Sequence, residues 1–299
     1  MEYVQFKDLQ LSRFCMGGCP MGGYGWGETQ ESDFIEAIHE ALDRGVNFFD
    51  TANTYGFGQS EETLAKGLAG RRHEVVIQSK FGVRVMQDMV GRKTIYDNSP
   101  DYIDIYTIHY RDKETPLEDV VSTLESLREE GKVRHFGISN IHRDSMQEFL
   151  PFRELFATCQ DEYSLACRKN EADLNMIRTE LGALPMTWGS LGQGILTGKY
   201  DASVSFGDND RRKRDIYVNF HGEKLKKNLE IVEAMKPIAA AHGKSCAATA
   251  IRFILDHLPD SIVTAGVKNI GQMKSNLEGL DWHLTEEELK VLDDISREG

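Results

Sequence analysis

Short runs of β-branched and aromatic residues alternate with longer amphipathic segments along this chain of 299 residues. Such alternation is typical of βα units, in which a helix carries the chain back so that successive strands run parallel. The candidate strands are residues 46–49, 75–79, 103–108, 133–137, 156–159, 184–187, 262–265 and, with a weaker pattern, 277–282. Because eight parallel strands close a barrel, the sequence predicts an α/β fold of the (β/α)8 TIM barrel type.

The segments between these strands carry helical patterns. Residues 31–44 place their apolar side chains on one helical face and end at Gly45, a residue type that commonly stops a helix. Further helices are expected at residues 116–130, 171–181, 223–242, 245–257 and 285–296.

The start of the chain has a different pattern. Residues 3–6 and 11–16 flank a polar turn, which predicts an N-terminal β-hairpin that plugs the bottom of the barrel. No tandem repeat, low-complexity tract or linker divides the chain, so we expect residues 1–299 to form a single barrel domain.

The composition limits the partners and the compartment. A net charge of -13 repels nucleic acids and anionic membranes, and a mean hydropathy of -0.43 without a long apolar run argues against a membrane protein. The basic run at residues 211–214 lies among Gly, Asp and Asn and is expected to be a solvated loop. Five scattered cysteines, an odd number, and a polar N-terminal segment favour a cytoplasmic protein with free thiols.

Residues 17–27 are rich in glycine, as phosphate-binding loops often are. They contain no G-x-G-x-x-G and no G-K-[ST], and no strand leads from them directly into a helix. We therefore expect a loop over the mouth of the barrel, in which Trp26 forms an apolar wall of the substrate pocket.

Chemically useful side chains recur just after the predicted strands. They are Asp50, Lys80, His109, Ser139, Asn140, Gln160, Trp188, Gly266 and Lys268. The carboxyl ends of barrel strands meet at one face, where barrel enzymes have their active sites, so these residues are expected to converge there. Taken singly, each also has a structural explanation: Asp50 can cap a helix, Lys80 can be a surface lysine, and His109 can be a buried histidine.

Two other chemistries have little support in the sequence. The nine histidines show no H-E-x-x-H, and His109 has no Cys or His at ligand spacing, so no metal site is predicted. The segment around Ser139 reads G-I-S-N, which is not the G-x-S-x-G of a serine hydrolase.

Three segments resemble, in order and in position at strand ends, the catalytic motifs of the aldo-keto reductase superfamily: residues 50–56 (DTANTYG), 79–80 and 108–109. The resemblance continues through residues 137–140, 160–163, 189–194 and 266–276, and so covers nearly the whole chain. It implies an NADP(H)-dependent oxidoreductase whose partner is a small molecule, an aldehyde, ketone or sugar-like carbonyl, or the corresponding alcohol.

The resemblance also implies a role for each catalytic residue. Tyr55 would protonate the carbonyl oxygen, or deprotonate the alcohol, while hydride is transferred. Lys80 is expected to lower the pKa of Tyr55, and Asp50 to keep Lys80 charged and oriented. His109 would polarise the substrate oxygen, with Tyr110 beside it in the substrate pocket.

The contacts with NADP(H) follow from the same resemblance. Ser139, Asn140 and Gln160 would bond the carboxamide, and Trp188 would stack on the nicotinamide. The pyrophosphate would lie along Gly189, Ser190, Leu191, Gln193, Gly194 and Leu196, and the adenosine end along Gly266, Lys268, Gln272 and Asn276. Lys268 is the cation expected at the 2′-phosphate, which favours NADP over NAD.

The sequence departs from the family between the second and third predicted strands. The family usually has a helix here, but Ser99 and Pro100, a good helix start, lead directly into the strand at 103–108. Only residues 81–102 remain for the connection, so the barrel is expected to lack one helix, which bears on the position of His109 more than on that of Tyr55.

Two alternative functions stay open: a regulatory or redox-sensing barrel that binds nicotinamide, and an epimerase or lyase that uses nicotinamide transiently. The complete set of Asp50, Tyr55, Lys80 and His109 favours a reductase over a pure binding protein. The loops expected to select the substrate have no readable code, so the sequence gives neither the substrate nor the oligomeric state.

Overall fold

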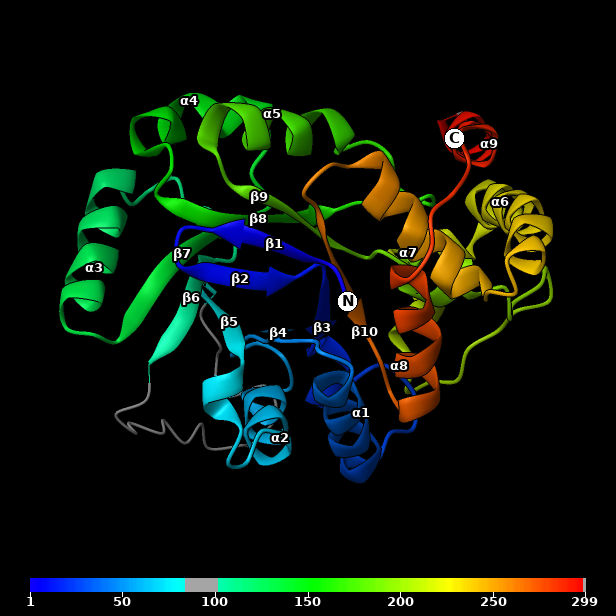
Figure 1. Cartoon of the computed structure of the whole chain (residues 1–299), viewed down its shortest axis with the longest axis horizontal. Helices are drawn as coiled ribbons and strands as arrows, with labels where there is room; N and C mark the ends of the chain where they lie inside the picture. The colour runs from blue at the N-terminus through cyan, green and yellow to red at the C-terminus, as the bar shows by residue number, and fades with distance from the viewer. Residues whose placement is uncertain (84–101, 298–299) are drawn as a thin grey trace.

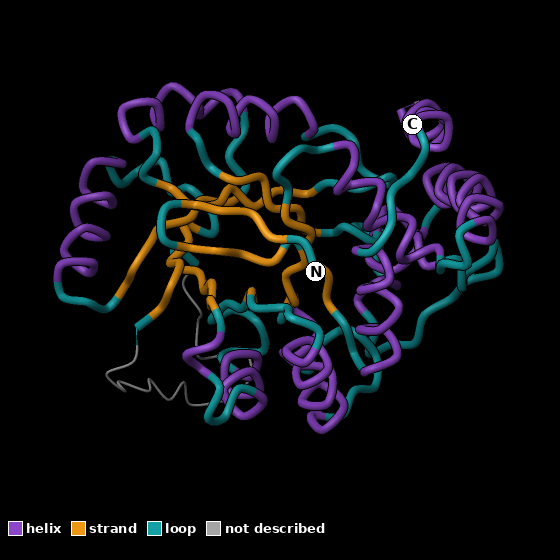
Figure 2. The backbone as a smooth tube through the Cα atoms, in the orientation of Figure 1, coloured by secondary structure: helices purple, strands orange, loops and turns teal. Residues whose placement is uncertain are grey.

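The computed structural model describes residues 1–83 and 102–297 of the chain. Eight parallel strands close a barrel in the order β10, β3, β4, β5, β6, β7, β8, β9 (Figures 1 and 2). The strands are β3 (Phe14–Gly17), β4 (Phe48–Asp50), β5 (Val76–Phe81), β6 (Ile103–Ile108), β7 (Val133–Ser139), β8 (Phe156–Glu162), β9 (Leu184–Trp188) and β10 (Ile262–Gly266). The predicted TIM barrel is confirmed.

Helices surround the barrel, as Figure 2 shows in purple around the orange strands. They are α1 (Glu31–Asp43), α2 (Gln59–Gly67), α3 (Leu117–Glu129), α4 (Met146–Phe149), α5 (Glu171–Leu181), α6 (Gly222–Ala241), α7 (Cys246–His257), α8 (Ile270–Leu277) and α9 (Glu286–Arg297). The expected helices correspond to α1, α3, α5, α6, α7 and α9. In α1, Phe34 and Ile38 are buried on the apolar face, whereas α9 packs against α6 and α7.

The eighth strand is not where the sequence pattern places it. The predicted strand at 277–282 is wrong, because α8 ends at Leu277 and a 3-10 turn (Glu278–Leu280) follows. Leu277 and Leu280 are buried at helical spacing, and Gly279 packs so closely on α7 that a Cβ there would lie 2.9 Å from the side chain of Ile251. The barrel is closed instead by β3, whose residues are all buried, so that it lacks the alternation that identifies a strand.

The N-terminal hairpin is confirmed, with a shorter second strand than expected. Strands β1 (Tyr3–Phe6) and β2 (Leu9–Ser12) pair antiparallel and lie across one end of the barrel (Figure 1). Leu9 and Leu11 are buried in a cluster with Phe48, Ile105 and Met186 from the barrel strands. The hairpin therefore closes the end opposite the carboxyl ends of the strands.

The sequence patterns do not predict α2 and α8. The nine residues of α2 are mostly polar. Its buried face consists of Ser60, Thr63, Leu64 and Gly67, of which only Leu64 has a large apolar side chain. Gly67 lets α2 approach α1 closely, since a Cβ there would lie 2.5 Å from Cδ1 of Ile38. The helix therefore depends on a close tertiary contact rather than on amphipathic periodicity.

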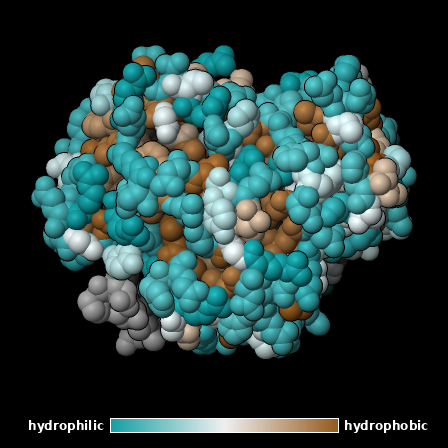
Figure 3. All heavy atoms as spheres, viewed as in Figure 1, coloured by the Kyte–Doolittle hydropathy of each residue, from teal (hydrophilic) through white to brown (hydrophobic). Residues whose placement is uncertain are grey.

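The connection between β5 and β6, for which the sequence predicts a missing helix, lies mostly outside the described residues, at 84–101. On the face that carries the hairpin, hydrophilic residues dominate the surface, and apolar side chains show between them in small areas (Figure 3). Within the described residues, no helix has the length and apolarity needed to cross a membrane.

Candidate active site

Asp50, Lys80 and Tyr55 meet at the carboxyl end of the barrel. Asp50 ends β4 and Lys80 lies near the end of β5, and these two strands are neighbours in the sheet. Lys80 Nζ donates to Asp50 Oδ1 at 2.6 Å, to the carbonyl of Thr51 at 3.0 Å and to the Tyr55 hydroxyl at 3.1 Å. Both charged side chains are almost fully buried, so the ammonium is fixed between the carboxylate and the phenol.

The environment of Tyr55 keeps its phenol protonated. Burial raises the pKa of Tyr55 well above that of a free phenol, and the negative charge of Asp50 acts in the same direction. The expectation that Lys80 lowers the pKa of Tyr55 stays a prediction, because burial and Asp50 set the net upward direction. Tyr55 is therefore protonated near neutral pH.

His109 follows β6 directly and faces Tyr55. Their rings are nearly perpendicular with centroids 6.3 Å apart, and Tyr110 stacks on the other side of His109 at 4.7 Å. Burial, and next the charge of Lys80, lower the pKa of His109 to about 4. The imidazole is therefore neutral at pH 7. Its buried Nδ1 has no hydrogen-bond partner among the described residues, which leaves it available to a ligand.

The residues predicted for the nicotinamide lie at the ends of the next three strands. Ser139 ends β7, Gln160 lies in β8, and Trp188 ends β9 and is partly exposed. Asn140 has a left-handed backbone with φ of 56°, and its Nδ2 donates to Ser139 Oγ at 2.9 Å and to the carbonyl of His109 at 3.1 Å. Asn140 therefore connects the expected cofactor position to His109.

The predicted pyrophosphate segment follows β9 and includes Gly189, Ser190, Leu191, Gln193, Gly194 and Leu196. Its backbone turns sharply, with positive φ at Gln193 (55°) and Gly194 (106°). The Ser190 hydroxyl is buried and donates to the carbonyl of Thr264 at 2.9 Å, and Leu196 is fully buried in the core. The side chains at these two positions are therefore used within the fold.

The predicted adenosine end lies just beyond β10, which ends at Gly266. Lys268 donates from Nζ to the carbonyl of Trp26, and its backbone N–H donates to Gln272 Oε1 at 2.9 Å. Asn276 is 3% exposed, and its Nδ2 has no hydrogen-bond partner in the described part of the chain. A buried amide without a partner is costly, so this group fits a ligand with an acceptor atom.

Comparison with known proteins agrees with this geometry. A family model described as "Aldo/keto reductase family" matches residues 13–297. The chain belongs to the aldo/keto reductase family. It is 32% identical to the aldo-keto reductase YhdN of Bacillus subtilis (strain 168), across 99% of this chain and 93% of that protein. It is 28% identical to the NADH-specific methylglyoxal reductase of Escherichia coli, across 97% of this chain and 96% of that protein.

Solved structures of the family have the same barrel. A glycerol dehydrogenase from Gluconobacter oxydans is 31% identical, with a TM-score of 0.84, over 98% of this chain and 94% of that one. An aldo-keto reductase from Klebsiella pneumoniae in complex with NADPH is 25% identical, with a TM-score of 0.75, over 99% of this chain and 95% of that one. The prediction of an oxidoreductase of this family is confirmed.

In this aldo/keto reductase, Arg212 is not the solvated loop residue that the basic run predicts. It is only 7% exposed and forms an ion pair with Asp210. It also donates to the carbonyl of Gln193 at 3.3 Å and to the Tyr200 hydroxyl at 2.8 Å. The rings around its guanidinium, 4.4 to 5.8 Å away, belong to Trp26, Tyr200, Phe206 and Phe220. In the sequence, Tyr200, Phe206 and Phe220 near the basic run could have indicated that this arginine is buried among aromatic rings.

Glu162 is a second site residue that the sequence reasoning misses. It ends β8 opposite Trp188, and its Oε1 accepts a hydrogen bond of 3.3 Å from Gln193 Nε2. Gln193 Oε1 in turn accepts from Asn219 Nδ2 at 2.5 Å. The side chain of Gln193 is thus held from both ends, which stabilises its left-handed backbone beside the expected pyrophosphate.

The glycine-rich loop crosses the mouth of the barrel, as predicted, and contains a short 3-10 helix (Cys19–Gly22). Gly22 touches the catalytic segment so closely that a Cβ there would lie 2.6 Å from the backbone N of Gly56. Trp26 forms a β-bridge with Asp210, so it lies toward Lys268 and the expected adenosine end. The loop therefore contacts both the catalytic and the cofactor sides of the site.

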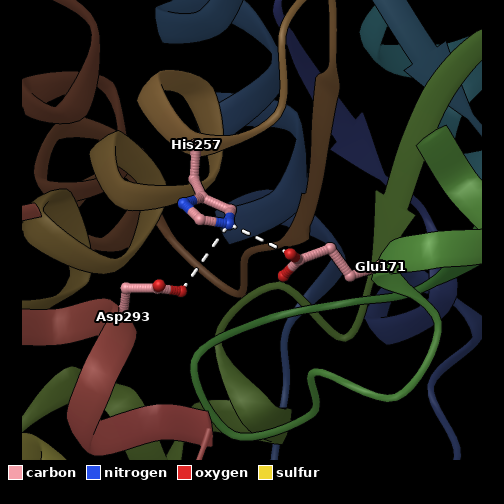
Figure 4. A group of neighbouring side chains, drawn as sticks. All are labelled: Glu171, His257 and Asp293. Carbon is pink, nitrogen blue, oxygen red and sulfur yellow. Dashed lines mark hydrogen bonds and ion pairs between the residues drawn. The ribbon is translucent and has the colours of Figure 1, made fainter. Parts of the chain in front are cut away.

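One group of side chains has the spacing of a metal site, although none is predicted. Glu171, His257 and Asp293 place one ligand atom each within 4.8 Å of one another (Figure 4). Arg168 pairs with both carboxylates, and Arg297 pairs with both as well. Two guanidinium groups already balance the two negative charges, so we interpret the group as an ion-pair network that holds α9 against α5 and α7.

Proposed function

We propose that this aldo/keto reductase is an NADP(H)-dependent enzyme that reduces the carbonyl of an aldehyde, ketone or sugar-like molecule, or oxidises the corresponding alcohol. One observation carries the proposal: Lys80 Nζ lies 2.6 Å from Asp50 Oδ1 and 3.1 Å from the Tyr55 hydroxyl. Together with the unpartnered His109 across from Tyr55, this arrangement offers a proton donor and a polar contact to one substrate oxygen.

Tyr55 gives its proton to the carbonyl oxygen as negative charge develops there. Lys80 stabilises the phenolate that forms, because its ammonium donates directly to the hydroxyl. Asp50 holds the Lys80 ammonium in place, and neutral His109 offers a ring nitrogen to the same oxygen. A bound dihydronicotinamide supplies the hydride, so these residues need only position the substrate and move one proton.

The residues around the expected cofactor position fit a dinucleotide. At one end, Asn276 Nδ2 is a hydrogen-bond donor without a partner among the described residues. At the other end, the partly exposed Trp188 offers an aromatic surface. Between them, the left-handed backbone of Gln193 and Gly194 brings main-chain groups to the surface of the site.

The choice of NADP over NAD rests on the charges around Lys268. Burial, and next the charges of Arg212 and Lys199, lower the pKa of Lys268, while Asp210 is the carboxylate that opposes this. Three cations against one carboxylate favour an additional anion such as a 2′-phosphate. The relatives include both an NADH-specific reductase and a complex with NADPH. The preference of this chain therefore needs the direct comparison of the two nucleotides described below.

A regulatory barrel, or an epimerase that uses nicotinamide transiently, has less support from this geometry. A pure binding protein has no need for a buried Lys80 whose contacts include the Tyr55 hydroxyl. All five cysteines are free thiols, which supports the proposal of a cytoplasmic enzyme.

The test combines cofactor binding with turnover in wild type and Tyr55→Phe. NADPH and NADH are titrated by fluorescence, and oxidation of the reduced cofactor is then followed with aldehydes, ketones and sugars. We expect tighter binding of NADPH than of NADH, equal NADPH affinity in both proteins, and a loss of about 10³-fold or more in turnover for the variant. Binding without turnover by wild type would favour the regulatory alternative, and binding of neither nucleotide would rule out the assigned cofactor.

A further inference from the structure

Arg211 is a cation at the mouth of the barrel whose side chain is held firmly. Its Nη2 donates to the carbonyl of Tyr24 at 2.6 Å. The guanidinium lies 5.6 Å from the ring centroid of Tyr24 and 5.2 Å from that of Trp26. Gly25 provides the space between these two rings, because a Cβ at this position would lie 2.6 Å from Arg211 Nε.

Arg211 nevertheless has no counterion. Within residues 1–83 and 102–297, no carboxylate forms an ion pair with it, and its Nε is buried without a hydrogen-bond partner. Its neighbours differ, since Arg212 pairs with Asp210 and Lys213 with Asp208. Contact with aromatic faces and the bond from Nη2 to Tyr24 occupy part of the guanidinium, and its remaining Nη N–H groups match the oxygens of a carboxylate or phosphate.

Arg211 packs on the loop that touches the catalytic segment. Burial raises the pKa of the Cys19 thiol in this loop, and the charge of Arg211 partly opposes this. Cys19 is also among the groups that act on the phenol of Tyr55. The loop against which Arg211 packs touches the catalytic segment at Gly22, next to Gly56. The loop that holds the Arg211 guanidinium thus also reaches the backbone of Tyr55 and Gly56.

We propose that Arg211 binds an anionic group, a carboxylate or a phosphate, carried by the carbonyl substrate. This inference rests on the proposed reductase function and narrows it to substrates with a negative charge away from the reacting carbonyl. The chain has a net charge of -13 and so repels anions at long range, which makes a local cation necessary for such a substrate. The partner of the unpaired guanidinium is thus supplied by the molecule to be reduced.

The test compares two aldehydes of the same shape, 4-carboxybenzaldehyde and methyl 4-formylbenzoate, in wild type, Arg211→Met and Arg211→Lys. Arg214→Met is the matched control, because it removes the same charge from the same segment at an exposed position. A second measurement needs no turnover: calorimetric binding of benzoate and of its neutral analogue benzamide, with and without NADP+. NADPH affinity is measured for each variant.

We expect wild type to favour the carboxylate aldehyde, and Arg211→Met to lose about 10-fold to 100-fold in kcat/KM for it through KM alone. The ester, NADPH affinity and the Arg214→Met control should stay unchanged, and benzoate should lose its advantage over benzamide. Arg211→Lys should recover part of the loss. The inference is wrong if both aldehydes respond equally, if Arg214→Met has the same effect, or if only NADPH binding weakens, which would assign Arg211 to a cofactor phosphate. If wild type reduces neither aldehyde, the proposed function fails, while benzoate binding still decides the role of Arg211.

Discussion

Two charge clusters in this protein each contain an ion pair of the same length, but they differ in how completely their polar groups are partnered. In the catalytic group (Asp50, Tyr55, Lys80 and His109), Lys80 Nζ lies 2.6 Å from Asp50 Oδ1. In the α9 cluster (Arg168, Glu171, His257, Asp293 and Arg297), Arg168 Nη2 also lies 2.6 Å from Asp293 Oδ1. The ion pairs are alike, so the contrast lies in the groups around them.

Every charge of the α9 cluster is met by several partners. Arg168 also pairs with Glu171 and bonds Ser296, and its guanidinium lies over the rings of Tyr163 and Phe253. Burial would raise the pKa of Glu171, but hydrogen bonds from His257, Arg168 and Tyr163 hold it well below its usual range. Such a closed network stabilises the fold and leaves no group free for a ligand.

The catalytic group is open by comparison. His109 Nδ1 has no hydrogen-bond partner among the described residues, and burial keeps the phenol of Tyr55 protonated beside an ammonium. An unsatisfied polar atom costs free energy in the folded protein, and a substrate oxygen can satisfy it. The comparison shows that completeness of partners, rather than the ion pair itself, distinguishes a reacting site from a structural network.

The same substitution in both clusters gives the sharpest test, and the largest effect is expected for Lys80→Met. It removes the ammonium that stabilises phenolate and leaves Asp50, 2% exposed, without its cation. We expect kcat/KM to fall by about 10³-fold or more, and the free energy of unfolding by about 3–5 kcal/mol. Steady-state kinetics and urea unfolding measure the two. A normal kcat would show that Lys80 has only a structural role.

Arg168→Met should lower the stability of the fold without lowering the activity. Glu171 and Asp293 would lose their shared guanidinium, but Arg297 would remain, so we expect a loss of about 2–3 kcal/mol in the free energy of unfolding. The kcat should change by less than about twofold, because the cluster lies on the helices outside the barrel. A matched change, Lys290→Met, removes an exposed ion pair with Asp294 and should leave the free energy of unfolding nearly unchanged. If folded Arg168→Met lost activity, the α9 cluster would not be purely structural.

Arg212 lies between these extremes, because it is fully partnered yet borders the cofactor segment. Arg212→Met should free the carbonyl of Gln193 and the carboxylate of Asp210, and weaken NADPH binding by about 10-fold. With saturating NADPH, kcat should remain within a few-fold of wild type. Lys213→Met, at an exposed position, serves as the control. Unchanged NADPH affinity would make Arg212 a residue of fold stability alone.

The sequence predicts those parts of the molecule that follow local rules. Strand β6 is predicted with its observed limits, and the residues that converge at the barrel mouth follow from strand ends and from the family resemblance. Residues 14–16 of β3 are predicted as part of the hairpin and helix α8 is missed, because both elements are defined by burial that local periodicity does not reveal. The burial of Arg212 depends on rings that the fold packs around it, and the high pKa of Tyr55 depends first on burial, so both emerge only from the fold.

The smallest expected effect is on the pH dependence of stability. It tests whether the unpartnered His109 of the catalytic group lowers the free energy of unfolding. The pKa of His109 in the folded protein, about 4, is below its unfolded value near 6.5. Between these values the unfolded state binds more protons at this residue, so its contribution to stability is lost as pH falls from about 6.5 toward 4.

Asp161 acts in the opposite direction over part of this range, because burial raises its pKa to about 6 and its ionisation opposes folding as pH rises. The difference between wild type and His109→Gln removes the shared contribution of Asp161. We expect the unfolding free energy of wild type to fall relative to the variant by up to about 1 kcal/mol per pH unit below pH 6. Parallel pH curves for the two proteins would show that His109 gains its protons equally in both states, and that the catalytic group carries no such cost.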